Sequence, residues 1–94
     1  MKCTSLNEVR QHIDSIDNKI IKLIAERGTY VAQAAAFKKT EDAVKAPDRV
    51  ESVIAKVRTK AEEYGANPDM IESLYREMIR NFIRMEMTEF HKNS

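Results

Sequence analysis

The stretch Ser5–Lys39, SLNEVRQHIDSIDNKIIKLIAERGTYVAQAAAFKK, decides the fold that this chain is expected to adopt. Residues that are apolar with one exception recur along it in alternating steps of three and four. This pattern is typical of a helix that packs its apolar side, called the seam here, against other helices. Ser5 and Glu8 are spaced as a capping box at its start. Nothing breaks the helix after that, so about 35 residues predict a rod of roughly 50 Å. The seam comprises Leu6, Val9, Ile13, Ile16, Ile20, Leu23, Arg27, Tyr30, Ala34 and Phe37.

Arg27 is the seam member that does not fit the apolar pattern. A guanidinium is costly to bury unless an anion meets it. One interpretation is a structural ion pair with an acidic neighbour, such as Glu26 or Asp17. The other is an anionic ligand, and the remaining sequence bears on the choice.

The composition is that of a small chain with balanced charge. Its 94 residues are expected to form a single domain, 1–94, with a marginal core of its own. Apolar residues make up 43% and charged residues 33%, and the net charge of +1 gives no support for a nucleic-acid binder. No apolar run is long enough to span a membrane, and no signal-peptide core follows Met1. The lone Cys3 cannot form an internal disulfide, which favours a reduced, cytoplasmic setting.

Two shorter helices are expected after the rod. The polar stretch 40–47 is expected to be a loop because it ends in a proline. A second helix opens directly after it and stops at Gly65. Asn67 can cap a third helix that begins at Pro68 and frays near His91. These elements leave about 55 residues to cover the rod, too few for its whole length, so two rods are expected to pair in a homodimer.

Two cationic side chains fall on one side of the predicted rod. Arg27 and Lys38 are 11 residues apart. This is three helical turns plus about 20°, and about 16 Å along the axis. Both side chains are long enough to converge on one small anion. Arg10 lies about 25 Å from Arg27 and about 100° round the helix, so it reaches the same pocket only from the partner helix of an antiparallel pair.

Two further polar residues, Glu86 and Arg49, lie at positions in the second and third helices from which they could reach a binding pocket. Glu86 follows Phe82 by one turn in the third helix, at the edge of the apolar face. A carboxyl group there is half-buried or faces a pocket. Arg49 starts the second helix near the loop.

Each cation also has a purely structural interpretation. Lys38 alone is most often a solvated cation near a helix C-terminus, and Arg10 is spaced to pair with Asp14. No metal site is expected, because His12 and His91 lack partners at ligand spacing. There is also no Gly-rich phosphate loop and no activated nucleophile with a nearby base, and no cofactor is expected.

The spacing Arg10-x16-Arg27-x10-Lys38, followed by a short loop and Arg49, resembles the all-α chorismate mutases. The segment IDSIDNKI at 13–20 and the third-helix segment LYREMI at 74–79 are similar to that family as well. The resemblance covers nearly the whole chain. It implies an all-α fold of three helices, one very long, that form an intertwined homodimeric helical bundle. Each of its two sites is built from both chains.

The resemblance also implies a role for each polar residue. Arg27 and the partner subunit's Arg10 fall on the arginines that bind the substrate carboxylates, and Arg49 on the substrate-binding arginine of the second helix. Lys38 falls on the lysine that contacts the substrate ether oxygen. Glu86 falls on the second polar contact to the same oxygen.

Three positions depart from the common family pattern. Many members have Gln at the position of Glu86 and a small hydroxyl residue at that of Phe82. Directly after the second-helix arginine, many members have a Glu that contacts the substrate hydroxyl. This chain has Val50 at that substrate-binding position. Val50 and a loop one residue tighter than in standard bacterial mutases resemble the isochorismate–pyruvate lyases, relatives that make salicylate.

The activity implied is the intramolecular [3,3] rearrangement of chorismate to prephenate, in aromatic amino-acid biosynthesis. It needs orientation of a small dicarboxylate and stabilisation of charge on the ether oxygen, but no nucleophile, metal or redox cofactor. Lys38 and a protonated Glu86 are the expected donors, and Arg10 and Arg27 the carboxylate clamps. Two alternatives stay open: an isochorismate–pyruvate lyase and, from another class, a non-catalytic helical dimerisation module.

Overall fold

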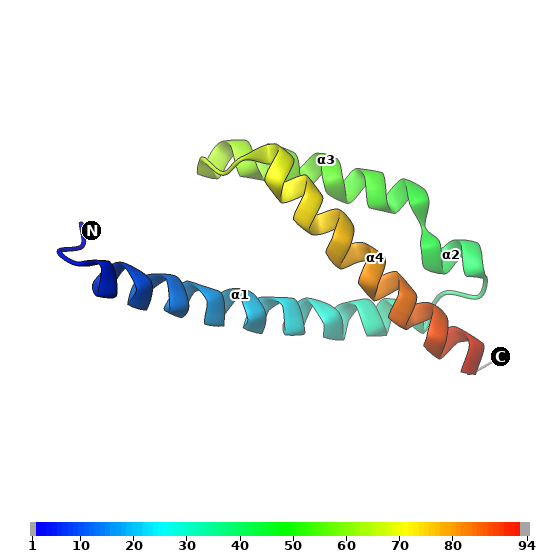
Figure 1. The fold of residues 1–94 in the computed structure, drawn as a ribbon. Coiled ribbons are helices and arrows are strands. Elements are labelled where there is room, and N and C mark those ends of the chain that lie inside the picture. The colour runs from blue at the N-terminus through cyan, green and yellow to red at the C-terminus, as the bar shows by residue number, and fades with distance from the viewer. Residues whose placement is uncertain (1, 93–94) are drawn as a thin grey trace. The chain divides into compact units, whose positions relative to one another are not determined.

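The computed structural model describes residues 2–92, and every regular element in that range is helical (Figure 1). The helices are α1 (Leu6–Ala35), α2 (Glu41–Lys45), α3 (Pro47–Tyr64) and α4 (Pro68–Lys92). The predicted all-α fold with one very long helix is confirmed. The prediction of a loop over 40–47 was wrong in part, because the short α2 occupies most of it. The chain divides into two compact units, with the boundary between Val31 and Ala32.

The start of α1 is capped by residues that precede it. The Glu8 backbone N–H donates to Ser5 Oγ at 3.1 Å, as the capping-box prediction required. The Glu8 carboxylate does not return to Ser5, however. Its Oε2 accepts from the Thr4 hydroxyl at 2.8 Å and from the Thr4 backbone N–H at 3.4 Å. The N-terminal segment is therefore tied to the first turns of the helix through Glu8.

The end of α1 comes four residues before the predicted end. Backbone N–H groups of Ala36, Phe37 and Lys38 donate to carbonyl groups three residues earlier, at 3.0–3.2 Å, which tightens the chain into turns. The chain must leave the helix here because Thr40, the cap of α2, has extended backbone. Lys38 therefore lies outside α1, and the prediction that it shares a helical face with Arg27 was wrong.

The part of α1 up to Val31 forms one unit by itself, and no residue of α1 is buried. Its apolar seam is exposed to a degree unusual for such residues: Ile13, Ile16 and Ile20 are each about half exposed. A single helix cannot bury its own apolar stripe, and α1 leaves this one exposed.

The unit from Ala32 onward contains the core. α3 packs along α4, and α2 packs against α4. Gly65 ends α3 at φ 77°, a left-handed conformation that glycine adopts without steric cost. Asn67 Oδ1 then accepts from the backbone N–H groups of Asp69 and Met70, which caps α4. Both boundaries agree with the prediction. The buried residues of this unit are Val44, Ile54, Ala61, Ile79 and Glu86.

An ion-pair network joins α3 to α4. Arg76 of α4 donates two hydrogen bonds of 2.9 Å to the carboxylate of Glu51 on α3, and one of 2.7 Å to Glu72. Arg58 of α3 donates to Glu72 and Asp69 at 2.8 and 3.0 Å. The hydrogen bonds from Arg76 hold the pKa values of Glu51 and Glu72 below the ordinary range. A two-pronged arginine–carboxylate contact fixes orientation as well as distance, so the network sets the register of α3 on α4.

No helix in the described range combines the length and the apolar character that a membrane crossing requires.

Candidate active site

The side chains of Lys38 and Glu86 form the central contact of the candidate site. Lys38 Nζ donates to Glu86 Oε2 at 3.0 Å, and both residues belong to the unit from Ala32 onward. The Glu86 side chain is 8% exposed and that of Lys38 is 23% exposed. The interpretation of Lys38 as a solvated helix-end cation is therefore wrong. The two residues proposed as donors to the substrate ether oxygen contact one another directly.

The turn after α1 and the short α2 place Lys38. Thr40 Oγ1 accepts from the Ala43 backbone N–H at 3.0 Å, which caps the start of α2 at Glu41, three residues after Lys38. Val44, 2% exposed, is the most buried side chain of the unit and seats α2 against α4. Burial of one valine side chain contributes about 1.5–3 kcal/mol, enough to hold a five-residue helix that is too short to be stable alone. α2 therefore anchors the backbone that carries Lys38.

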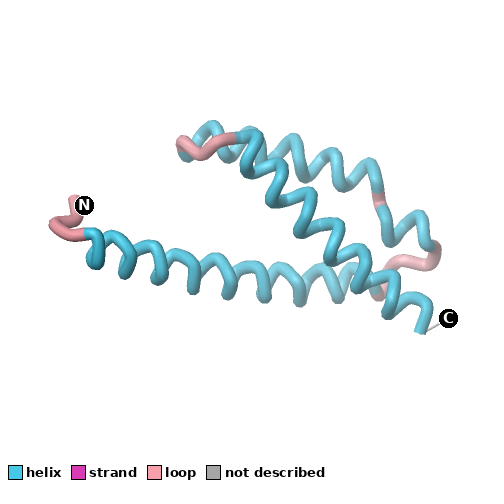
Figure 2. Tube along the Cα trace, in the orientation of Figure 1, coloured by secondary structure: helices cyan, strands magenta, loops and turns pink. Residues whose placement is uncertain are grey.

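A single residue joins α2 to α3. Ala46 has φ 40° and ψ 59°, ends α2 by donating its N–H to the Asp42 carbonyl at 2.8 Å, and precedes Pro47 at the first position of α3. Figure 2 shows this junction as a short loop segment between the two helices. Arg49 and Val50 follow in the first turn of α3, the former exposed and the latter half-buried.

Glu86 lies on the buried face of α4. Ile79 and Glu86 are the two buried residues of α4 and are seven positions apart, which places them two turns apart on one face. Glu86 thus takes a position that a core apolar residue usually occupies. Within the described residues, no buried side-chain nitrogen or oxygen lacks a hydrogen bond. Phe82, one turn before Glu86, is half-buried.

The chemistry of this contact follows from its hydrogen-bond inventory. An ammonium has three N–H donors, and Lys38 uses one of them on Glu86. Its remaining donors, and Glu86 itself when protonated, can both serve one oxygen atom placed beside the pair. Two donors converging on one atom in a poorly hydrated place are the arrangement that stabilises developing negative charge.

The arginines predicted to bind carboxylates differ in their surroundings. Arg49 is exposed and forms no hydrogen bond or ion pair within residues 2–92. Arg10, in the other unit, is also exposed, and the ion pair considered between Arg10 and Asp14 is not formed. Arg27 is half-buried on α1. The proposed roles of these three arginines as substrate clamps stay predictions.

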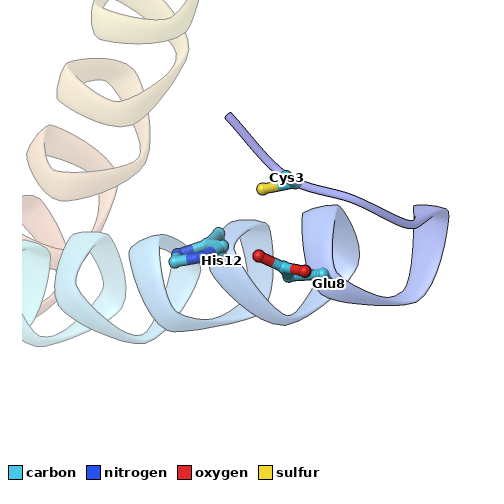
Figure 3. A group of neighbouring side chains, drawn as sticks. All are labelled: Cys3, Glu8 and His12. Carbon is cyan, nitrogen blue, oxygen red and sulfur yellow. The ribbon is translucent and has the colours of Figure 1, made fainter. Parts of the chain in front are cut away.

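A second group of polar side chains was missed in the sequence. Cys3, Glu8 and His12 bring a thiol, a carboxylate oxygen and an imidazole nitrogen within 4.8 Å of one another (Figure 3). The statement that His12 lacks partners at ligand spacing was therefore wrong. Glu8 and His12 are four residues apart in a helix, a signal that the sequence contains. The approach of Cys3 follows from the hydrogen bonds between Thr4 and Glu8, which the sequence does not reveal.

Comparison with known proteins identifies the class to which this fold and this site belong. Residues 9–87 match the family of type II chorismate mutases. The match covers most of the chain, and the chain belongs to this family. The resemblance drawn from the spacing of Arg10, Arg27 and Lys38 is thereby confirmed.

The relatives of this chain include both an isochorismate pyruvate lyase and a chorismate mutase. An isochorismate pyruvate lyase from Pseudomonas aeruginosa is 36% identical over 81 residues, 86% of this chain and 80% of that protein. A chorismate mutase from Methanocaldococcus jannaschii is 30% identical over 77 residues, 81% of this chain and 78% of that protein. A T-protein from Enterobacter agglomerans is 34% identical over 76 residues, and the chain spans only 20% of its length.

Proposed function

We propose that this protein is a chorismate mutase that rearranges chorismate to prephenate. The proposal rests on the 3.0 Å contact between Lys38 and the buried Glu86, in a chain that belongs to the type II chorismate mutases. In the rearrangement the ether C–O bond breaks while a C–C bond forms in one cyclic step, and no atom enters or leaves. The protein therefore has two tasks, to hold the substrate in a compact conformation and to stabilise charge on the ether oxygen.

Lys38 and Glu86 carry the second task in this proposal. As the C–O bond breaks, the ether oxygen gains negative charge, and an ionised Glu86 beside it is repelled. A protonated Glu86 donates a hydrogen bond instead. Each donor contributes on the order of 3–4 kcal/mol to the transition state.

Arginines carry the first task, and they come from two chains. Arg27 and the partner subunit's Arg10 clamp the two substrate carboxylates, with Arg49, Val50 and Phe82 completing the pocket. The pairing of two chains is supported by α1, whose 30 residues span about 45 Å and bury none of their apolar seam. A second copy of the chain presents the same stripe, so an isologous pairing covers both.

A second activity has its own support. The 36% identity to a lyase that covers most of both chains favours isochorismate–pyruvate lyase activity, as do Val50 and the short loop before Arg49. Cleavage of isochorismate to salicylate and pyruvate can also proceed as a concerted cyclic step. It breaks an ether C–O bond, so the same two donors serve it.

Product analysis tests both activities. The purified protein is incubated with chorismate and, separately, with isochorismate, and products are separated and identified by mass and absorbance. Prephenate from chorismate supports the proposed function, whereas salicylate with pyruvate from isochorismate alone supports the lyase. Absence of any product above the uncatalysed background, from a folded dimer, would favour the non-catalytic dimerisation module. The single domain and the cytoplasmic setting inferred from Cys3 stay predictions.

A further inference from the structure

We propose that Cys3, Glu8 and His12 form a binding site for a borderline divalent transition-metal ion, Zn²⁺ under cellular conditions. The three ligand atoms lie within 4.8 Å of one another, and all three residues belong to the N-terminal unit. None of the three residues belongs to the Lys38–Glu86 pair, and the proposal does not rest on the proposed function.

The first argument is geometric. Zn²⁺ bonds to sulfur, nitrogen and oxygen are about 2.0–2.3 Å long, so two ligand atoms on one tetrahedral ion lie about 3.5 Å apart. The observed upper limit of 4.8 Å exceeds this by roughly one ångström, which side-chain rotation can close. Figure 3 shows Cys3 on the segment that passes back over α1, with Glu8 and His12 on successive turns beneath it. The ligands thus approach from two directions, as a tetrahedral ion requires.

The second argument concerns which lone pairs are occupied. Cys3 and His12 form no hydrogen bond or ion pair within residues 2–92, although Cys3 is half-buried. The Glu8 carboxylate is oriented by Thr4, whose N–H and hydroxyl both donate to Oε2, which leaves Oε1 for an ion. Metal-bound carboxylates are commonly held by such outer hydrogen bonds. Thr4 therefore supports the ligand without competing for it.

The third argument is the identity of the ion. A thiolate, an imidazole and a carboxylate together are the mixed sulfur, nitrogen and oxygen set that zinc and its neighbours accept, whereas Mg²⁺ and Ca²⁺ take oxygen alone. A thiolate and a carboxylate also neutralise the two charges of the ion. Three protein ligands leave one tetrahedral position for water.

The experiment measures metal binding to the full chain under reducing, chelator-free conditions. Zn²⁺ is titrated calorimetrically into the wild type and into the Cys3→Ser, Glu8→Gln and His12→Gln variants. His91→Gln is the matched control, because His91 is the other histidine of the chain and pairs with Glu41 far from the cluster in sequence. Circular dichroism checks that each variant keeps its helical content.

The expected result is one Zn²⁺ per chain, bound at least tenfold more weakly by each of the three ligand variants and unchanged in His91→Gln. Loss of an outer partner alone costs about 10–100-fold in affinity, so loss of a ligand costs at least as much. Co²⁺ should give a sulfur-to-metal charge-transfer band that disappears in Cys3→Ser, and Mg²⁺ should not compete. Unchanged affinity in any ligand variant, an equal loss in His91→Gln, or bound Co²⁺ without the band would overturn the proposal.

Discussion

Lys38 and Glu86 are 48 positions apart in the chain, and their side chains meet at 3.0 Å between Nζ and Oε2. Glu86 is one of the few buried residues of its unit, alongside four apolar ones. A buried ion pair is weak support for stability, because desolvation of both charges offsets their attraction. An apolar residue would fill the position at least as well. We therefore interpret the pair as a feature of the site's chemistry rather than of the fold.

Replacing Lys38 with alanine should reduce turnover much more than substrate binding. The ammonium acts mainly on charge that develops in the transition state, so kcat with chorismate should fall about 10²–10³-fold while KM changes little. Steady-state kinetics on the purified variant measure both constants. Lys39→Ala is the matched control, because Lys39 is the adjacent, exposed lysine and is expected to leave both constants unchanged.

The effect of Lys38→Ala on stability needs separation from its effect on rate. Removing one partner of a buried pair costs at most about 3–5 kcal/mol, and less here because Lys38 is partly exposed. The double variant Lys38→Ala/Glu86→Gln removes the unpaired charge and should regain much of that stability, without regaining activity. If the double variant recovered both, the loss of rate would reflect folding rather than chemistry.

Replacing Glu86 with glutamine should keep a hydrogen-bond donor at this position, whereas alanine removes it. The glutamine amide always donates, so Glu86→Gln should hold or raise the turnover of chorismate at neutral pH. Glu86→Ala should lower kcat about 10²–10³-fold, because one donor to the ether oxygen is lost. Steady-state kinetics on the purified variants measure this. Glu89→Gln, an exposed substitution on the same helix, should leave the turnover unchanged. Equal losses in Glu86→Gln and Glu86→Ala would remove Glu86 from its proposed role as a donor.

Arg10→Ala and Arg27→Ala should each lose activity and should complement one another when mixed. A mixed dimer has one site with both arginines intact. After random subunit exchange, half of the dimers are mixed and each has one complete site of two, so about a quarter of wild-type activity should return. Activity is measured before and after exchange, with each variant alone as the control. No recovery would count against shared sites, and unfolding of Arg27→Ala would favour its structural ion-pair interpretation.

The Arg76 network should contribute stability near neutral pH that is lost in acid. Its hydrogen bonds lower the folded-state pKa values of Glu51 and Glu72. The resulting stabilisation is complete above the unfolded pKa of about 4.3 and is lost as the pH falls through the lower folded values. The melting temperature of Arg76→Gln should therefore drop less than that of the wild type between pH 6 and 3. Arg80→Gln, which removes an exposed pair with Glu77 on one helix, should follow the wild type; equal drops in all three proteins would dismiss the network.

The helices were predictable because their signals are local. The seam of α1, the glycine at position 65 and the cap at Asn67 each act within a few residues, and all three were correct. The end of α1 was not predictable from the same signals. Ala34, Ala35 and Ala36 favour continuation of a helix, and the competing requirement comes from Thr40, which caps a five-residue helix with no periodicity long enough to recognise.

The candidate site divides in the same way. Glu86 was identifiable because a carboxyl group interrupts an apolar stripe. Lys38 was named with it as the second donor to the ether oxygen, but on the face of α1 that carries Arg27. The turn after Ala35, which the sequence did not reveal, is what carries Lys38. The spacing of four between Glu8 and His12 was visible, but an i,i+4 pair is common on helix surfaces. Cys3 lies close to Glu8 and His12 only because of the path of the backbone before α1, which the sequence does not reveal.

The single residue Ala46 sets the angle between α2 and α3. It is the C-cap of the first helix and the N-cap of the second, so no further residue separates them. Pro47 directly after it has a φ angle fixed by its ring. The angle between the two helices therefore depends on the two torsion angles of one alanine, which lie in the left-handed region that few residues other than glycine favour. A glycine at position 46 would remove the steric cost of this conformation and would let the angle between the two helices vary.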